Sequence, residues 1–314
     1  MRATFAIPAL AAATAVALTV AGFAAPANAE DDVKRIVFMA GPASHGYEAH
    51  EHYAGCRLLA DWLEESGLPV ETEVFRHDWP EDPDAFDGAD ALVIFSNGGG
   101  GHPVLPHMDQ VQELIDAGIG FGAIHYAVEV PIEYGDQFRN WLGGYFEVHW
   151  SVNPFWVAEY SEFPDHPVTN GVSPFEIEDE WYFNMRFSGR AVPILTDAPP
   201  SHTRTDRGDG PHSNNPFVRN NEGRPEHTAW VAEREDGGRS FGFTGAHWHR
   251  NWANPDFRTT VLNGVAWIAG LEVPDDGVPS WDLTVDDLRE NQDYDEPDDF
   301  NWDHIEELIA SWTE

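Results

Sequence analysis

Cysteine is nearly absent from the sequence, since Cys56 is its only cysteine. A disulfide framework is therefore excluded, whichever compartment the protein occupies. Cys56 lies in a predicted helix in which Leu59, Trp62 and Leu63 recur at helical spacing. We interpret it as a buried structural thiol in preference to a nucleophile, because free cysteine usually packs as a small apolar residue.

Basic residues are also scarce: Lys and Arg number 17 against 55 Asp and Glu, which gives a formal net charge of -38. A nucleic-acid partner is excluded, because binding one requires cations that neutralise a run of phosphates. We read the acidity as a solvated surface suited to high salt, with an acidic partner-binding face as the alternative. An anionic polysaccharide would be repelled, which favours a neutral or small substrate.

Long hydrophobic runs are missing after Glu30, so no membrane span is expected in the mature chain. Residues 1–29 differ, because Arg2 precedes an apolar stretch over 9–25, and Ala27-Asn28-Ala29 has the small-x-small form of a cleavage site. We interpret this segment as a cleaved signal peptide, with an uncleaved membrane anchor as the alternative. The mature protein is then expected to be secreted or periplasmic.

The remaining chain alternates apolar strands with amphipathic helices. Strands are predicted at 33–40, 70–75, 91–96 and 118–125, and helices at 48–65 and 106–117. This alternation predicts an α/β fold with a mostly parallel sheet and helices on both faces. After residue 150, shorter strands, a hairpin over 229–245 and a helix over 256–269 follow. We therefore expect one α/β domain over 30–272 and an acidic C-terminal extension over 273–314.

Histidines and acids stand where these predicted strands end. The most informative stretch is 118–129, a buried strand that runs into a tight turn with His125 at its tip. Ligands bind at the carboxyl ends of the strands in open α/β sheets. Comparable positions are held by His45, His102, Glu180, His247 and His249.

Several of these residues have the spacing of metal ligands. His125 and Glu129 are four residues apart, and His247 and His249 alternate, so either pair can face one ion. A histidine pair can also simply pack and form hydrogen bonds, and Glu180 can be a solvated acid instead of a ligand or base. His45 is a better candidate for the site than His50 or His52, because these two histidines are expected on the following helix.

The glycines at 98–101 form a loop that ends in His102-Pro103. Glycines let a backbone approach a ligand closely, which suits sugar hydroxyls or an oxyanion. A phosphate loop is excluded, because it would end in Gly-Lys-Ser or Gly-Lys-Thr. The alternative is a tight strand-to-helix turn without a ligand.

Five motifs, in order along the chain, resemble the ThuA-like (trehalose utilisation) family. They are the segments 41–46, 120–125, 165–171, 178–182 and 241–247. The resemblance implies a flavodoxin-like sheet, similar to class I glutamine amidotransferases, whose nucleophile elbow carries a cysteine. Here His125 stands at the elbow and His247 at the position of the later histidine, so glutamine hydrolysis through a thiolate is excluded. The resemblance also implies a role in carbohydrate catabolism, beside dehydrogenases that make 3-keto glycosides.

We therefore hypothesise a lyase or hydrolase that cleaves a glycoside, the 3-keto form above all, by metal-assisted proton abstraction and elimination. His125 or Glu180 is the expected base, and a zinc, manganese, nickel or iron ion is expected on His45, Glu129, His247 and His249. The residues expected to contact the sugar are Gly99, Gly100, His102, Tyr126, Trp181, His212 and Trp248. Alternatives are a metal-dependent hydrolase or isomerase of another sugar derivative and a non-catalytic carbohydrate-binding protein. The expected partners are a small carbohydrate and an upstream sugar dehydrogenase.

Overall fold

The computed structural model describes residues 1–2, 33–205, 210–213 and 215–313. The predicted signal peptide and its cleavage site lie outside the described residues, apart from Met1 and Arg2. Within the described ranges, no helix combines the length and apolar character that crossing a membrane requires. The described residues from Val33 onward form one compact unit.

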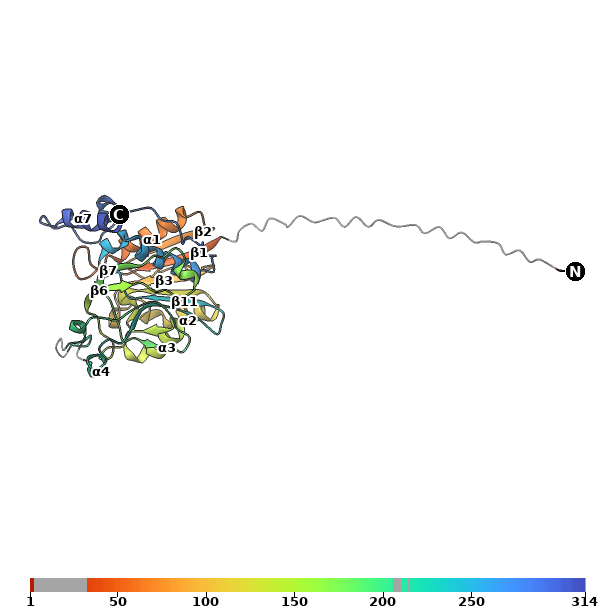
Figure 1. The fold of residues 1–314 in the computed structure, drawn as a ribbon, viewed down its shortest axis with the longest axis horizontal. Helices are drawn as coiled ribbons and strands as arrows, with labels where there is room; N and C mark the ends of the chain where they lie inside the picture. Colours follow the sequence, from red (N-terminus) through yellow and green to blue (C-terminus); the bar gives the residue numbers. More distant parts are fainter. Residues whose placement is uncertain (3–32, 206–209, 214, 314) are drawn as a thin grey trace. The chain divides into compact units, whose positions relative to one another are not determined.

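A seven-stranded sheet forms the centre of the domain (Figure 1). In spatial order its strands are β2 (Val70–Arg76), β1 (Lys34–Ala40), β3 (Ala91–Phe95), β4 (Gly120–Ile124), β11 (Arg239–Phe243), β10 (Glu226–Glu233) and β9 (Val192–Asp197). The pairings from β2 to β11 are parallel, and the two pairings of β10 are antiparallel. The predicted α/β fold with a mostly parallel sheet is therefore confirmed.

Alternate residues of the central strands enter two different cores. Ile36 and Phe38 of β1 pack with the helices α1 and α5, whereas Val37 and Met39 pack with α2 and α3. The bounds of these helices are α1 His52–Glu65, α2 Met108–Asp116, α3 Gly135–Trp141 and α5 Pro255–Ile268. Both faces of the sheet are therefore covered, which explains why its inner strands are continuous apolar runs.

Two small antiparallel sheets are added to this frame. They pair β6 (Phe155–Tyr160) with β7 (Phe175–Glu180) and β5 (Gly144–Tyr145) with β8 (Arg186–Phe187). The shorter strands expected after residue 150 include β6 and β7, and the expected hairpin is β10–β11, but the sequence analysis overlooked the edge strand β9. Pro193 lies inside β9, and proline in an apparent strand argues against that assignment except at a sheet edge.

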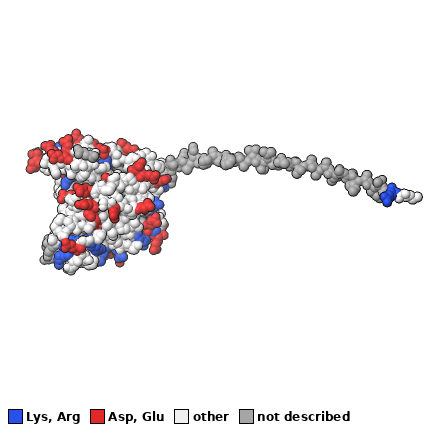
Figure 2. All heavy atoms as spheres, viewed as in Figure 1, with Lys and Arg blue, Asp and Glu red and all other residues white. Residues whose placement is uncertain are grey.

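The C-terminal extension packs on the α1 side of the domain. It contains the helices α6 (Val285–Arg289) and α7 (Trp302–Thr313), and Leu288 and Ile305 belong to the same core as α1. Figure 2 shows acidic side chains gathered along the top of the visible face, where Figure 1 places α7. The extension therefore has an acidic outer surface and an apolar inner one.

Gly120, at the start of β4, offers a direct test of this packing. A Cβ added there would lie 2.2 Å from the backbone carbonyl oxygen of Ile268, at the end of α5. We expect Gly120→Ala to lower the free energy of unfolding by about 1–3 kcal/mol, because backbone must move to admit the methyl group. Gly189→Ala is the control, since its added Cβ meets nothing within 4 Å. Equal denaturant midpoints for the two variants would contradict the described packing of β4 against α5.

Candidate metal centre

Four side chains meet at the carboxyl edge of the sheet: His50, His125, Glu180 and His247. His125 directly follows β4, His247 follows β11, and His50 lies in the loop after β1. Glu180 is the last residue of β7, so it reaches the site from the added β6–β7 hairpin. The parallel strands therefore bring three histidines to one edge, and the hairpin adds a carboxylate.

One atom of each side chain faces the others. His50 Nε2 lies 3.0 Å from His125 Nε2 and 2.9 Å from His247 Nδ1. The Oε2 atom of Glu180 lies 3.3 Å from His247 Nδ1 and 3.6 Å from His125 Nε2. All four ligand atoms lie within 4.8 Å of one another, and the three imidazoles are buried.

The hydrogen bonds around the imidazoles determine where their protons are. His125 Nδ1 lies 2.8 Å from the carbonyl oxygen of Thr244, which can only accept, so Nδ1 carries the hydrogen. Burial holds the pKa of His125 well below its usual value, which keeps the ring neutral. His125 Nε2 therefore presents a lone pair to the cluster.

The hydrogen bonds of Ser44 determine which ring nitrogen of His50 carries the hydrogen. The Asn97 side-chain nitrogen donates to the carbonyl of Pro42, which fixes the orientation of the Asn97 amide. The Asn97 Oδ1 atom therefore faces Ser44 and accepts its single hydroxyl hydrogen at 2.5 Å. Ser44 Oγ must then accept from His50 Nδ1, at 3.1 Å, and from His45 Nδ1, at 2.8 Å. Burial also lowers the pKa of His50, so its Nε2 atom carries a lone pair.

Two lone pairs thus face each other across 3.0 Å, and neither nitrogen has a hydrogen to share. A cation between them removes this repulsion, and neutral imidazoles with a carboxylate are a donor set typical of zinc, nickel, manganese or iron. Metal-binding histidines usually donate their other N–H to a carbonyl or similar acceptor, as His125 and His50 do here. The four residues fit a divalent metal ion.

The backbone around the ligands is held in an uncommon conformation. His125 has φ 55°, His50 has φ 52° and Ala246, beside His247, has φ 81°. Non-glycine residues seldom adopt this region, and they cluster at functional sites when they do. Asp179 secures the turn at His247, because its carboxylate accepts from the backbone amides of Ala246 at 2.7 Å and His247 at 3.0 Å. Burial raises the pKa of Asp179.

Several other predicted site residues lie around the cluster without belonging to it. His45 is exposed, and its ring centre lies 4.0 Å from that of His50. Tyr126 is half-buried, with its ring centre 6.0 Å from that of His50, and burial raises its pKa to about 12.

Glu129 is buried, and its carboxylate lies 3.0 Å from His212 Nε2. It is close to the turn Gly99–Gly101, in which Gly100 is exposed. Ligand roles for His45 and Glu129 therefore stay predictions.

Three further predicted residues lie inside the protein instead of in the site. Trp181 is fully buried, and its indole nitrogen donates to the Ile177 carbonyl at 3.3 Å, so no ring face is open to a sugar. His102 is buried, with Nε2 bound to the carbonyl of Ala127. His249 is buried, and neither ring nitrogen has a hydrogen-bond partner among the described residues. Burial lowers its pKa to about 3. All three residues are buried in this structure, and the roles expected for them stay predictions.

Five residues that the sequence analysis did not assign contribute to the site: His50, Ser44, Asp179, Phe155 and Tyr182. The Tyr182 hydroxyl lies 3.2 Å from His125 Nε2. His50 was expected on a helix, but α1 begins at His52 and leaves His50 in the loop. Asp179 lies on the inward face of β7 with Ile177, an alternation that the sequence does display. Phe155 is 38% exposed and touches both His247 and Trp248, with ring centres 4.8 Å and 5.6 Å away. With Trp248, it forms an aromatic edge to the site.

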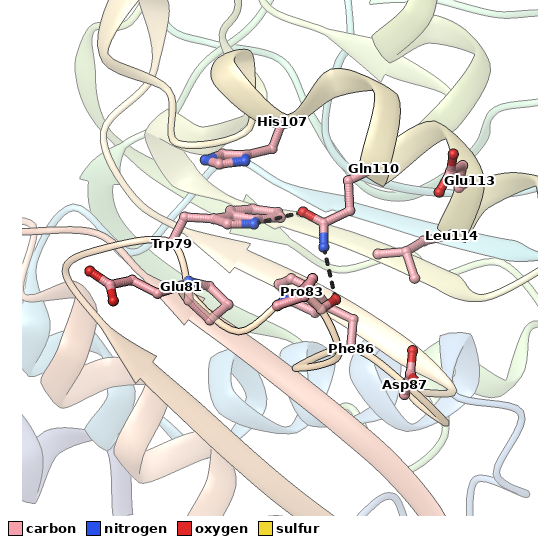
Figure 3. Close-up of a pocket in the computed structure, with 10 residues that line it drawn as sticks. Trp79, Glu81, Pro83, Phe86, Asp87, His107, Gln110, Glu113 and Leu114 are labelled. Atoms are coloured by element: carbon pink, nitrogen blue, oxygen red, sulfur yellow. Dashed lines mark hydrogen bonds between the residues drawn. The ribbon is translucent and has the colours of Figure 1, made fainter.

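A separate hollow of about 470 Å³ lies between the loop after β2 and helix α2 (Figure 3). The rings of Trp79 and His107 stack there with centres 4.7 Å apart, and the Trp79 indole donates to Gln110 at 2.9 Å. The residues that line this hollow include none of the four cluster residues. The candidate centre is therefore distinct from it.

The burial of His102 predicts a dependence of stability on pH. Burial lowers its pKa to about 4 in the folded protein, against 6.5 for an ordinary histidine. The unfolded chain therefore takes up this proton first, and the stability contributed by neutral His102 is lost as the pH falls from about 6.5 to about 4.

We expect the difference in unfolding free energy between wild type and His102→Gln to change by up to about 3 kcal/mol over this window, because the variant has no proton to gain. Denaturant unfolding at several pH values measures it. A constant difference between the two proteins would contradict the buried, neutral state of His102.

Comparison with known proteins agrees with this architecture. The model of the ThuA family, described as trehalose utilisation, matches residues 36–268. No curated protein matches the chain. A putative ThuA-like protein from Bacteroides uniformis aligns with TM-score 0.53 and 13% identity over 78% of this chain and 95% of its own. One from Parabacteroides merdae aligns with TM-score 0.52 and 17% identity, over 77% of this chain and 92% of its own.

These two structures share the fold, and the family match extends from β1 to the end of α5. It includes the strands and loops that carry His50, His125, Glu180 and His247. The family's description supports a role in trehalose or carbohydrate utilisation. The chain belongs to the ThuA family.

Proposed function

We propose that the protein is a metal-dependent enzyme of carbohydrate catabolism that cleaves a glycoside, above all a 3-keto glycoside, by elimination or hydrolysis. The observation that carries the proposal is the convergence of the lone pairs of His50 and His125 beside His247 and Glu180, at the edge of the sheet where ligands bind. A protein that only bound sugar would not need such a donor set.

The proposed metal ligands are His50 Nε2, His125 Nε2, His247 Nδ1 and Glu180 Oε2. When bound, a divalent ion polarises a substrate carbonyl and stabilises the negative charge that forms on its oxygen.

Neighbouring residues orient these ligands. Thr244 and Ser44 keep the imidazoles of His125 and His50 in the tautomers that present lone pairs. Asn153 donates to the other oxygen of Glu180 at 2.9 Å and so leaves Oε2 to the cluster.

His45 is the best-placed general base in this arrangement. Its Nδ1 hydrogen is donated to Ser44, so its Nε2 atom carries the lone pair, and the ring is exposed beside the cluster. His125, one of the two bases expected from the sequence, has both nitrogens engaged and is assigned to the metal instead. Glu180 stays as the alternative base, because its side chain is partly exposed.

The proposed step begins with a proton on C2 of the sugar, which a 3-keto group makes acidic. His45 takes this proton, a C1–C2 double bond forms, and the C1–O bond breaks with its electron pair leaving on the aglycone oxygen. The protonated imidazole then returns the proton to that oxygen, so that no other reactant is needed. In hydrolysis, water adds afterwards to the unsaturated sugar.

Residues around the cluster supply the surfaces that a sugar requires. Trp248 and Phe155 offer aromatic faces on the His247 side, and Tyr126 lies on the His50 side. The His212–Glu129 pair and the exposed Gly100 turn can meet hydroxyl groups. The strongly acidic composition favours a neutral substrate such as this over an anionic one.

We also propose that the reaction occurs outside the cytoplasm and follows the oxidation of a glycoside. A 3-keto glycoside must come from oxidation of a glycoside at C3, so a sugar dehydrogenase is the class of enzyme that would supply the substrate. The signal-like segment over 1–29 supports action outside the cytoplasm.

The direct test is release of p-nitrophenol from the 3-keto form of a p-nitrophenyl glucoside, with the unoxidised glucoside beside it. We expect release from the keto form alone, and loss of release when a chelator removes the metal. His45→Gln should lower kcat by about 10²–10⁴-fold, the contribution of a general base, while the protein keeps its metal. His50→Ala should lose both activity and metal.

Equal cleavage of the two glucosides would exclude a keto-dependent elimination. Unchanged turnover in His45→Gln would transfer the role of base to Glu180.

A further inference from the structure

The loop that carries His50, here called the ligand loop (residues 41–51), is held in a strained conformation. His45, Glu48 and His50 have φ values of 73°, 69° and 52°, so three non-glycine residues within six positions lie in the left-handed region. Such residues persist only where the surrounding structure imposes them. The ligand loop therefore depends on contacts from outside itself.

The C-terminal extension supplies contacts at three points along the ligand loop. Asp293 Oδ2 accepts from the backbone amide of Ala43 at 3.1 Å, and Gln292 Oε1 accepts from the backbone amide of Glu48 at 3.1 Å. The backbone amide of Asp293 donates to Glu51 Oε2 at 2.6 Å. The loop is thus bound at its start, its middle and its end by two consecutive residues.

The Asp293 carboxylate is itself fixed by the end of β2. Arg76 donates to Oδ1 at 2.7 Å, and His77 Nε2 lies 2.8 Å from Oδ2. The side chain of Asp293 is only 10% exposed. It therefore connects three segments that are far apart in the sequence: the ligand loop, the end of β2 and the extension.

Apolar contacts hold the extension in this place. The ring of Tyr47, in the ligand loop, lies 4.9 Å from the ring of Phe300 and 6.2 Å from that of Trp302. Trp302 and Leu288 are part of the domain core. The family match ends at residue 268, so these contacts come from a segment outside it.

We propose that Asp293 is a positioning residue for the metal centre: through the ligand loop it holds His50 Nε2 in register with His125 and His247. Asp293 does not touch any of the four ligand atoms, so it acts through the backbone of the loop. The inference rests on the proposed metal centre. In this inference the C-terminal extension supplies the contacts that hold the ligand loop, and with it His50, in place.

The test is Co²⁺ binding to the metal-free full chain, measured by competition with a chromophoric chelator and by the visible spectrum of the bound ion. We expect Asp293→Ala to weaken Co²⁺ binding by about 10–100-fold and to change the spectrum, because His50 is no longer held in place. Asp293→Asn keeps one acceptor oxygen and should recover part of the affinity. Asp298→Ala is the matched control, because Asp298 is an exposed acid of the same extension.

Wild-type affinity and spectrum in Asp293→Ala would overturn the inference while leaving the proposed function intact. If wild type itself binds no Co²⁺, the proposed function fails together with it. Gln292→Ala covers the case in which Asp293→Ala does not fold, since it leaves Asp293 in place and removes the contact to Glu48 together with one hydrogen bond to the Leu288 carbonyl inside the extension. A weakened affinity in that variant supports the inference, and wild-type affinity in it overturns the role of the extension.

Discussion

The contact between His50 Nε2 and His125 Nε2, at 3.0 Å, is the constraint on which the rest of the site depends. Two imidazole nitrogens at this distance normally share a hydrogen, but Thr244 and Ser44 draw the hydrogens of both rings to their other nitrogens. A buried pair of acceptors needs donors or a cation beside it. The protein groups in reach are His247 Nδ1, 2.9 Å from His50 Nε2, and the Tyr182 hydroxyl, 3.2 Å from His125 Nε2, whereas one divalent ion would meet both lone pairs. The surroundings of the cluster therefore favour a bound positive charge.

Holding these rings in place engages parts of the chain that are remote in sequence. Asp179 fixes the turn before His247, Ser44 fixes the tautomer of His50, and Asp293 fixes the loop around it. Each contact opposes a backbone that would otherwise relax from the left-handed region. The parallel sheet gives the common edge, and these polar contacts give the alignment of the ligand atoms.

The frame of the fold was predictable from the sequence because the inner strands are apolar on both faces and alternate with helices. The same pattern placed His125 and His247 at strand ends and Glu180 at the end of a shorter strand. His50 was not predictable in this way, because its place depends on a loop with positive φ values and on where α1 begins. The burial of Trp181 and His102 was not predictable either, because local sequence does not reveal which side of a packed layer such residues face.

The central claim is that His50, His125, Glu180 and His247 bind one divalent ion, and elemental analysis of the purified protein tests it most directly. Wild type, His50→Ala and His45→Ala are incubated with divalent ions and desalted before their metal content is measured. The account predicts near-stoichiometric metal in wild type and in His45→Ala, and a large loss in His50→Ala. Wild type without metal after this treatment would contradict it, as would full occupancy in His50→Ala.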